Sequence, residues 1–264
     1  MGTLSPLLTV MTDVAGRAGR SLNRDFRDIE HLQVSRKGPS DFVSKADHKA
    51  EDIIYDRLMQ ARPGYGFLME ERGIVEGTDK AHRWIVDPLD GTTNFLHGMP
   101  HFAVSIALER EGELVAGVIY NPASDEMFHA EKGRGAWLAD RRLRVADRKH
   151  FDEAVIATGM PFSGKTGHAS FLKELHQVMP ATAGIRRMGS AALDLAWVAA
   201  GRYDGFWERN LKSWDIAAGI VLVKEAGGFV GEIDGRDDVL GTGNILAGNE
   251  AMIGFLGERL NAAR

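Results

Sequence analysis

The sequence predicts an α+β or layered α/β protein built as one unit. Three features indicate this class: a helical apolar pattern at the start, short apolar runs in the middle, and alternating strand and helix patterns after residue 150. A chain of 264 residues buries roughly three quarters of its unfolded surface on folding, so its core needs no disulfide. Because we find no repeat, low-complexity tract or linker, we expect residues 1–264 to form a single unit with two halves, 1–150 and 151–264.

Two helices are predicted in the first quarter of the chain. The first is indicated by apolar residues that recur at intervals of three and four. These are Leu4, Leu7, Leu8, Met11, Val14, Ala15 and Ala18. After a polar stretch, Ser44 and Asp47 have the spacing of a capping box that opens a second helix, which Pro63 and Gly64 end.

The rest of the chain is predicted as strands followed by alternating strands and helices. Apolar runs separated by turn residues indicate an antiparallel meander at 66–70, 83–87, 102–109, 113–120 and 126–133. Further strands are expected at 154–159, 203–208, 228–232 and 244–248. Helices are expected at 167–179, 190–200 and 213–226, and from residue 250 onward.

Composition excludes several classes of function. The chain has no cysteine, which rules out a disulfide scaffold, a zinc-thiolate site, an iron–sulfur cluster and a cysteine nucleophile. A net charge of −5 does not favour direct binding of nucleic acid. The first residues lack the pattern of a signal peptide, and no apolar run has the length of a membrane helix. We therefore expect a cytoplasmic protein with no membrane partner.

Acidic residues stand next to the ends of apolar segments at four places. Glu70 ends one strand, Asp87 ends the next, Asp90 follows one turn later, and Asp215 lies at the start of an apolar helix. A buried carboxylate is costly unless it is paired, hydrogen-bonded or bound to a cation. Taken singly, each of these residues is more often a cap or a turn former. The group as a whole indicates a cation site.

The residues after Asp90 strengthen this interpretation. Gly91, Thr92 and Thr93 place a glycine and two hydroxyl groups directly after the aspartate, where the free amides of a starting helix would favour an anion. Carboxylates that collect hard cations, beside amides that bind an anion, suit a phosphate ester with magnesium.

Three segments resemble the inositol monophosphatase family. The run Trp84–Phe95 is similar to its first signature, and Trp214–Gly219 with Lys224–Gly228 is similar to its second. Asp41–Asp47 resembles an earlier family element, with Ser44 where threonine is common. The order and spacing agree along nearly the whole chain. The resemblance implies a layered α/β/α/β/α sandwich of the sugar-phosphatase type and a homodimer.

The resemblance also implies magnesium-dependent phosphomonoesterase chemistry, with two or three Mg²⁺ ions per site and direct in-line attack by water. The implied metal ligands are Glu70, Asp87, the carbonyl of Leu89, Asp90 and Asp215. Thr92, hydrogen-bonded to Asp47, matches the pair that activates the water, with Glu70 as a further catalytic residue. The implied substrate contacts are Asp90, Gly91, Thr92, Thr93, Gly189, Ser190, Ala191, Glu208 and Asp215. Metal and phosphate would thus bind mainly to the first half, with Asp215 and substrate contacts from the second.

Two residues depart from the family pattern, and the substrate is not decided. Met69 stands where many relatives have glycine, and Arg72 lies in the loop that helps bind a weaker extra metal, which bears on metal number and lithium inhibition. The expected substrate is myo-inositol 1-phosphate. The alternatives are fructose 1,6-bisphosphate, histidinol phosphate and 3′-phosphoadenosine 5′-phosphate. An accessory role with RNA polymerase in ribosomal RNA synthesis is the non-enzymatic alternative.

Three other patterns are weighed against this function. Gly159–Thr166 matches the nucleotide-binding pattern G-x-x-x-x-G-K-T, but no second strand ends in a suitable aspartate, so we interpret it as a loop. His97 and His101 have Gly98 and Pro100 between them, which does not favour a helical zinc pair. The pair Arg186–Arg187 fits a phosphate or surface acids equally well.

Overall fold

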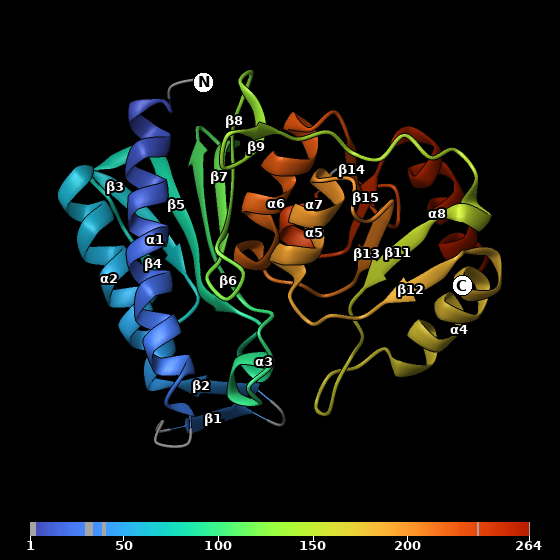
Figure 1. Ribbon diagram of the computed structural model, residues 1–264, viewed down its shortest axis with the longest axis horizontal. Coiled ribbons are helices and arrows are strands. Elements are labelled where there is room, and N and C mark those ends of the chain that lie inside the picture. Colours follow the sequence, from blue (N-terminus) through green and yellow to red (C-terminus); the bar gives the residue numbers. More distant parts are fainter. Residues whose placement is uncertain (1–3, 30–33, 39–40, 237, 264) are drawn as a thin grey trace.

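The computed structural model describes residues 4–29, 34–38, 41–236 and 238–263, and its elements form five layers. Figure 1 shows two helices on the left, a large sheet, a middle helical layer, a second sheet and two helices on the right. The predicted α/β/α/β/α sandwich is confirmed. In the described part of the chain, no helix combines the length and apolar character needed to cross a membrane.

The first layer consists of α1 (Pro6–Phe26) and α2 (Lys45–Ala61). The predicted capping box is present, because the Ser44 backbone N–H donates to Asp47 Oδ2 over 2.9 Å and Ala46 N–H donates to Ser44 Oγ over 3.1 Å. The apolar side of α1 is buried, as the periodicity predicts. Before α2, the chain forms a two-stranded sheet of β1 (Val34–Gly38) and β2 (Asp41–Ser44). The structure does not describe the side chain of Asp41.

The large sheet has eight strands in the order β10-β9-β8-β7-β6-β5-β3-β4. Their bounds are β3 (Tyr65–Met69), β4 (Gly73–Val75), β5 (Asp79–Asp90), β6 (Ala103–Arg110), β7 (Glu113–Asn121), β8 (Glu126–Glu131), β9 (Gly135–Leu138) and β10 (Arg141–Arg142). The predicted antiparallel meander is correct from β5 to β8 but wrong at its start, and β9 and β10 extend it by two strands that the sequence does not predict. β3 runs parallel to β5, because the intervening edge strand β4 reverses the chain once more.

The middle layer contains α5 (Ala191–Ala199) and α6 (Ser213–Glu225). Both helices are apolar on nearly all sides, as expected for helices that a sheet covers on each face. The backbone of α6 approaches β7 closely at Gly117, where an added β-carbon would lie 2.6 Å from the carbonyl oxygen of Ala218. The short helix α7 (Val239–Thr242) follows on the same side.

The second sheet has the order β12-β11-β13-β15-β14. Its strands are β11 (Val155–Thr158), β12 (Gly184–Arg186), β13 (Gly205–Glu208), β14 (Phe229–Glu232) and β15 (Ile245–Gly248). β11 pairs in parallel with β12 and β13, whereas β15 is antiparallel to β13 and β14. The outer helices α4 (His168–Val178) and α8 (Glu250–Ala262) cover its other face. All the strands and helices predicted after residue 150 are present.

Candidate active site

Four acidic side chains meet between the large sheet and the middle helices. Glu70 follows β3 and its N–H donates to the carbonyl of Val86 over 3.2 Å, which places it beside the end of β5. Asp87 and Asp90 lie in the last four residues of β5, and Asp215 is the third residue of α6. The negative charges of the other three acids each raise the pKa of Asp87. The acids that the sequence singles out therefore form one electrostatic cluster.

Burial makes the three aspartates of this cluster hard to ionise. Desolvation is the main cause that raises the pKa of Asp90 to about 6 and the pKa of Asp215 to about 8, and the negative charge of Asp90 adds to the shift of Asp215. The pKa of Asp87 is raised well above its ordinary value by burial and by the charge of Glu70. A divalent cation among these groups would favour their ionised forms.

Two of the three aspartates in the cluster also make the local hydrogen bond of a turn or a cap. Leu89 N–H donates to Asp87 Oδ1 over 2.9 Å, and Lys212 N–H donates to Asp215 Oδ2 over 2.7 Å. Asp90 instead accepts a hydrogen bond from a distant segment, because Ala192 N–H donates to its Oδ2 over 2.8 Å. The structural interpretation therefore holds for Asp87 and Asp215, and it is compatible with cation binding because a carboxylate offers two oxygens.

The donor set fits a hard divalent cation. Carboxylates and a backbone carbonyl are the ligands that magnesium prefers, and the chain supplies no thiol. Among the described residues, no group of three or more His, Asp or Glu side chains is arranged so that it could hold a metal ion. The fit therefore rests on the chemistry of the donors and not on their present arrangement.

Thr92 joins the cluster to Asp47 of α2. Its hydroxyl lies 3.2 Å from Asp47 Oδ1 and 3.0 Å from the carbonyl oxygen of Leu89, so the expected hydrogen bond is present. Burial raises the pKa of Asp47, although hydrogen bonds from Ser44 oppose this shift. Gly91 precedes Thr92 at the start of α3 (Thr92–Leu96) with a φ of 93°, a left-handed conformation that favours glycine.

The start of α5 lies against this turn. Ser190 caps α5 and its hydroxyl donates to Asp90 Oδ2 over 2.5 Å. Asn94 of α3 donates from its amide to the carbonyl of Met188 over 2.8 Å, which fixes the loop that carries Gly189. Ala191 is therefore held at the site as well. The side chain of Thr93 is exposed, and no hydrogen bond in the described part of the chain joins it to the acids.

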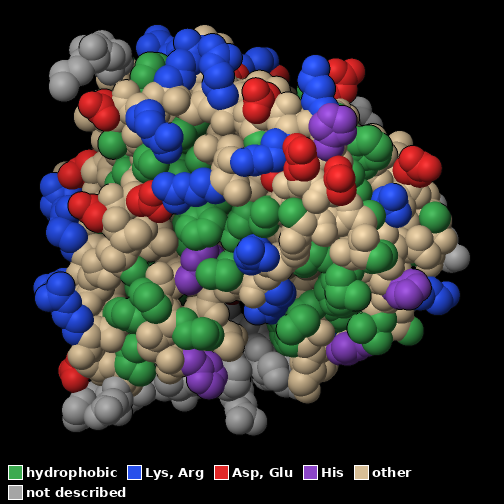
Figure 2. Space-filling view, turned by 45° about the vertical axis from the view of Figure 1, so that its right-hand side comes forward, with side chains coloured by type: hydrophobic (Ala, Val, Ile, Leu, Met, Phe, Trp, Pro, Cys, Tyr) green, Lys and Arg blue, Asp and Glu red, His purple; other side chains and the backbone are tan. Residues whose placement is uncertain are grey.

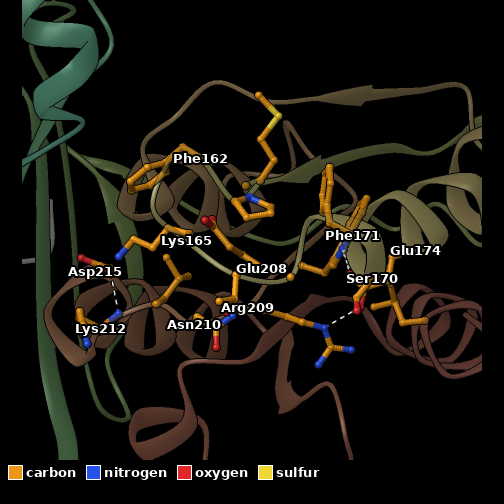
Figure 3. Close-up of a pocket in the computed structure, with 18 of the residues that line it drawn as sticks. Phe162, Lys165, Ser170, Phe171, Glu174, Glu208, Arg209, Asn210, Lys212 and Asp215 are labelled. Atoms are coloured by element: carbon orange, nitrogen blue, oxygen red, sulfur yellow. Dashed lines mark hydrogen bonds and ion pairs between the residues drawn. The ribbon is translucent and has the colours of Figure 1, made fainter. Parts of the chain in front are cut away.

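A cavity of about 730 Å³ opens beside the acids (Figure 3). Glu70, Glu208 and Asp215 line one end of it, and Glu208 extends from β13 into the cavity. Burial, and next the charge of Asp215, raise the pKa of Glu208 to about 8, while Arg187 lowers it. Glu208 is therefore largely protonated at neutral pH and can both donate and accept a hydrogen bond.

Comparison with known proteins assigns the chain to a family. The model of the inositol monophosphatase family matches residues 3–263. The chain belongs to the inositol monophosphatase family. An inositol-1-monophosphatase of Mesorhizobium japonicum is 64% identical over 94% of this chain and 93% of its own length. The predicted recognition is confirmed, and the protein is an enzyme of a phosphatase family.

Two further relatives extend the comparison. The crystal structure of extragenic suppressor protein suhB from Bartonella henselae has a TM-score of 0.95 and 58% identity, covering 97% of this chain and 98% of that one. Nus factor SuhB of Escherichia coli is 42% identical over 95% of this chain and 94% of its own length. The fold of this inositol monophosphatase family member is thus shared along the whole length.

Two residues beside the candidate active site were not assigned to it from the sequence. Asp194 of α5 is buried, and its pKa is raised well above the ordinary value by burial and by the charges of Glu208 and Asp90. One of its oxygens, Oδ1, has no hydrogen-bond partner in the described part of the chain. Its only signal was an acid inside an apolar helix. Arg187 is exposed, but its charge is close enough to Glu208 and Asp194 to lower the pKa of both, so it lies beside the site acids.

Other charged side chains are mixed on the surface of this family member. On the face in Figure 2, lysine and arginine are interspersed with acidic and hydrophobic side chains, without a continuous basic field. His101 is buried against the edge of the Trp197 ring, and burial lowers its pKa to about 4. It lies in the loop between α3 and β6, where the sequence places it, and its side chain is buried in the core.

Proposed function

We propose that this protein is a magnesium-dependent phosphomonoesterase that converts myo-inositol 1-phosphate, or a related polyol phosphate, to the free alcohol and phosphate. The observation that carries this proposal is the convergence of four carboxylates from β3, β5 and α6. They lie beside the hydrogen-bonded pair of Thr92 and Asp47, and two of them, Glu70 and Asp215, line one end of a cavity. The name of the Mesorhizobium relative supports inositol phosphate as the substrate.

The proposed cation ligands are Glu70, Asp87, Asp90, Asp215 and the carbonyl of Leu89. That carbonyl faces the site, because the Thr92 hydroxyl lies 3.0 Å from its oxygen. We propose two or three Mg²⁺ ions, which when bound would neutralise phosphate charge and lower the pKa of water. Ligands from three elements that pack on one core would keep the donors in place.

Thr92 and Asp47 would activate the attacking water. The Thr92 hydroxyl can donate its single proton to Asp47 or to the Leu89 carbonyl, and donation to Asp47 would leave its lone pairs to accept a proton from water. As water attacks phosphorus, the bond from phosphorus to the alcohol oxygen breaks, the proton of the water passes to the Thr92 oxygen, and the hydroxyl proton passes to Asp47. The departing alcohol oxygen takes up a proton from solvent water. A raised pKa suits Asp47 to hold that proton, and α2 fixes its carboxylate through Ser44.

The two sides of the substrate would bind to different segments. Backbone amides of Gly91, Thr92 and Thr93 would hold the phosphate at the start of α3. Gly189, Ser190, Ala191 and Glu208 would hold hydroxyl groups of the alcohol. A protonated Glu208 can donate to one hydroxyl and accept from another, which supports a polyol over an aromatic leaving group.

Phosphate release from myo-inositol 1-phosphate tests this function. We expect release with magnesium, none with a chelator, and none from the Asp90→Asn variant. Asp140→Asn serves as the matched control, because Asp140 is exposed in a turn away from the cavity lining. Turnover on fructose 1,6-bisphosphate, histidinol phosphate or 3′-phosphoadenosine 5′-phosphate instead would change the substrate but keep the reaction. No turnover on any ester would reject the phosphatase.

A second candidate function is an accessory role with RNA polymerase in ribosomal RNA synthesis. The observation that favours it is the relative named Nus factor SuhB. Retention of purified RNA polymerase by the immobilised protein would support this role, and retention no greater than on an unrelated protein would reject it.

From the family resemblance we also propose that the protein is a cytoplasmic homodimer and that lithium inhibits it. Sedimentation can check the dimer, and an inhibition assay can check the effect of lithium.

A further inference from the structure

We propose that Arg72 is a positioning residue for the candidate cation site. Through Glu51 of α2 it holds the hairpin that carries Glu70, and it thereby sets the affinity for the cation that Glu70 would bind. This inference rests on the cation site of the proposed function and adds to it a residue that supplies no ligand atom, because a guanidinium is itself a cation.

Glu70 lies at the start of a tight hairpin between β3 and β4. Met69 of β3 pairs with Gly73 of β4, so the tip consists of Glu70, Glu71 and Arg72 alone. Gly73 has a φ of 73°, the left-handed conformation that such a turn requires and that glycine adopts without strain. Because the tip is this short, a restraint on Glu71 or Arg72 also restrains the backbone of Glu70.

The buried carboxylate of Glu51 contacts both residues that follow Glu70 in the tip. Glu71 N–H donates to Glu51 Oε2 over 2.9 Å, and Arg72 Nε lies 3.6 Å from Glu51 Oε1. One oxygen thus holds the backbone of the hairpin, while the other faces the guanidinium. A hydrogen bond to a charged acceptor is about twice as strong as one between neutral groups, so Glu51 is a firm anchor for the tip.

Arg72 is fixed by two further groups of the same helix. Its guanidinium also pairs with Asp52, and its Cζ lies 4.4 Å from the centroid of the Tyr55 ring. Tyr55 in turn packs on Phe67 of β3, with the ring centroids 5.0 Å apart. A single exposed ion pair contributes little, but a planar guanidinium can meet carboxylates at its edge and a ring on its face at once. Arg72 is therefore held in one place although it lies at the surface.

The helix α2 connects this hairpin to the proposed water-activating pair. Glu51 lies four residues after Asp47, so both carboxylates project from the same face of the helix. Asp47 accepts the hydrogen bond from Thr92, one turn before the point where Glu51 holds the hairpin. Figure 1 shows α2 against the end of the large sheet that carries β3. One helix thus fixes both Asp47 and the segment of Glu70.

The charge of Arg72 and its role in positioning predict opposite effects on Mg²⁺ binding when it is removed. A cation within about one Debye length, about 10 Å at 0.1 M salt, repels Mg²⁺, so loss of the charge alone would tighten binding. Loss of positioning would weaken binding, because replacing a group that orients a metal ligand typically costs about 10- to 100-fold in affinity. Weaker binding after removal of Arg72 therefore indicates positioning.

The test measures Mg²⁺ binding to the substrate-free protein by calorimetric titration, in the wild type, Arg72→Met and Arg72→Lys. Arg83→Met is the matched control, because Arg83 is exposed to a similar extent and pairs with Glu109 in the same sheet. Glu70→Gln identifies the Mg²⁺ ion that Glu70 holds, and its combination with Arg72→Met completes a double-mutant cycle. Thermal melts in chelator check that each variant is folded.

We expect the Kd of that Mg²⁺ ion to rise about tenfold in Arg72→Met and to stay unchanged in Arg83→Met. It should rise less in Arg72→Lys, because an ammonium can still pair with Glu51 or Asp52. In the Glu70→Gln background, Arg72→Met should change the Kd by less than about twofold, because the ligand that Arg72 positions is gone.

Two results would reject the inference. One is an unchanged or lower Kd in Arg72→Met, and the other is a rise in Kd that is just as large in the Glu70→Gln background. In either case, Mg²⁺ binding by the wild type leaves the cation site of the proposed function standing. A wild type that binds no Mg²⁺ rejects both the cation site and the role of Arg72.

Discussion

The carboxyl group of Glu208 packs directly on the backbone of Gly159. A β-carbon built on Gly159 would lie 1.9 Å from the carboxyl carbon of Glu208, which is too close for two non-bonded atoms. Residue 159 must therefore be glycine for Glu208 to keep its place at the end of the cavity. The position of a proposed substrate ligand on β13 thus depends on the absence of a side chain just after β11.

Replacing Gly159 by alanine should displace Glu208 and weaken binding of the alcohol. A displacement of about 1 Å at a positioned group can cost up to about a hundredfold in rate, so we expect kcat/KM to fall by tenfold or more. Steady-state kinetics on the preferred ester measures this. Gly254→Ala is the control, because no atom lies within 4 Å of its β-carbon position. Equal kinetics in the two variants would contradict the proposed role of Glu208.

Removing one shared ligand should abolish stabilisation by magnesium. A ligand at a hundred times its dissociation constant stabilises a folded protein by about 2.7 kcal/mol. We expect Mg²⁺ to raise the Tm of the wild type by several degrees but to leave that of Asp87→Asn nearly unchanged. Thermal melts over a series of Mg²⁺ concentrations measure this, with Asp140→Asn as the control. A normal rise in Asp87→Asn would show that Asp87 is not a ligand.

The Thr92 hydroxyl should matter to turnover and not to metal binding. Loss of a positioned proton acceptor costs about 10²- to 10⁴-fold, so Thr92→Ala should lower kcat by at least a hundredfold. Thr92→Ser keeps the hydroxyl near Asp47 and should recover most of that loss. Single-turnover kinetics with the Mg²⁺ dependence of Tm separates the two effects. A Thr92→Ser variant as slow as Thr92→Ala would point to the methyl group instead.

Without metal, Glu208 should make stability fall as pH rises. Its pKa is about 8 in the folded protein, above its ordinary value of 4.5, so the folded state holds a proton that the unfolded state has released. Its stabilising contribution is complete below pH 4.5 and is lost as pH rises toward 8. Glu208→Gln should therefore gain Tm relative to wild type between pH 5 and pH 8, by at least about 2 °C. Melts in chelator at both pH values measure the difference, and a gap that narrows with pH would contradict it.

Most helices and strands could be predicted because their signals are local. The capping box at Ser44 and Asp47 and the apolar period of α1 depend on neighbouring residues only. The direction of β3 could not be predicted in this way. It is set by β4, an edge strand of three residues that is too short to recognise from the sequence. Parallel pairing of β3 and β5 is therefore a tertiary property.

The acids of the candidate site could be predicted because charges at the ends of buried strands are costly. Asp87 and Asp90 can be identified as candidates from the sequence without knowledge of the fold. Arg187 and Asp194 could not be placed, because their relation to Glu208 depends on how the start of α5 packs against α3 and β13. The sequence shows Lys165 only as part of a segment that matches a nucleotide-binding pattern. Its place in the cavity wall depends on the path of that loop in the folded protein.

The middle helical layer has a consequence for how the molecule melts. α6 contributes to the packing of both sheets, so neither sheet can lose it and keep a covered face. Asp215 lies in the first turn of that helix, so the acids separate as soon as α6 detaches. Heating should therefore show one cooperative calorimetric transition, in which the candidate site and the hydrophobic interior are lost at the same temperature.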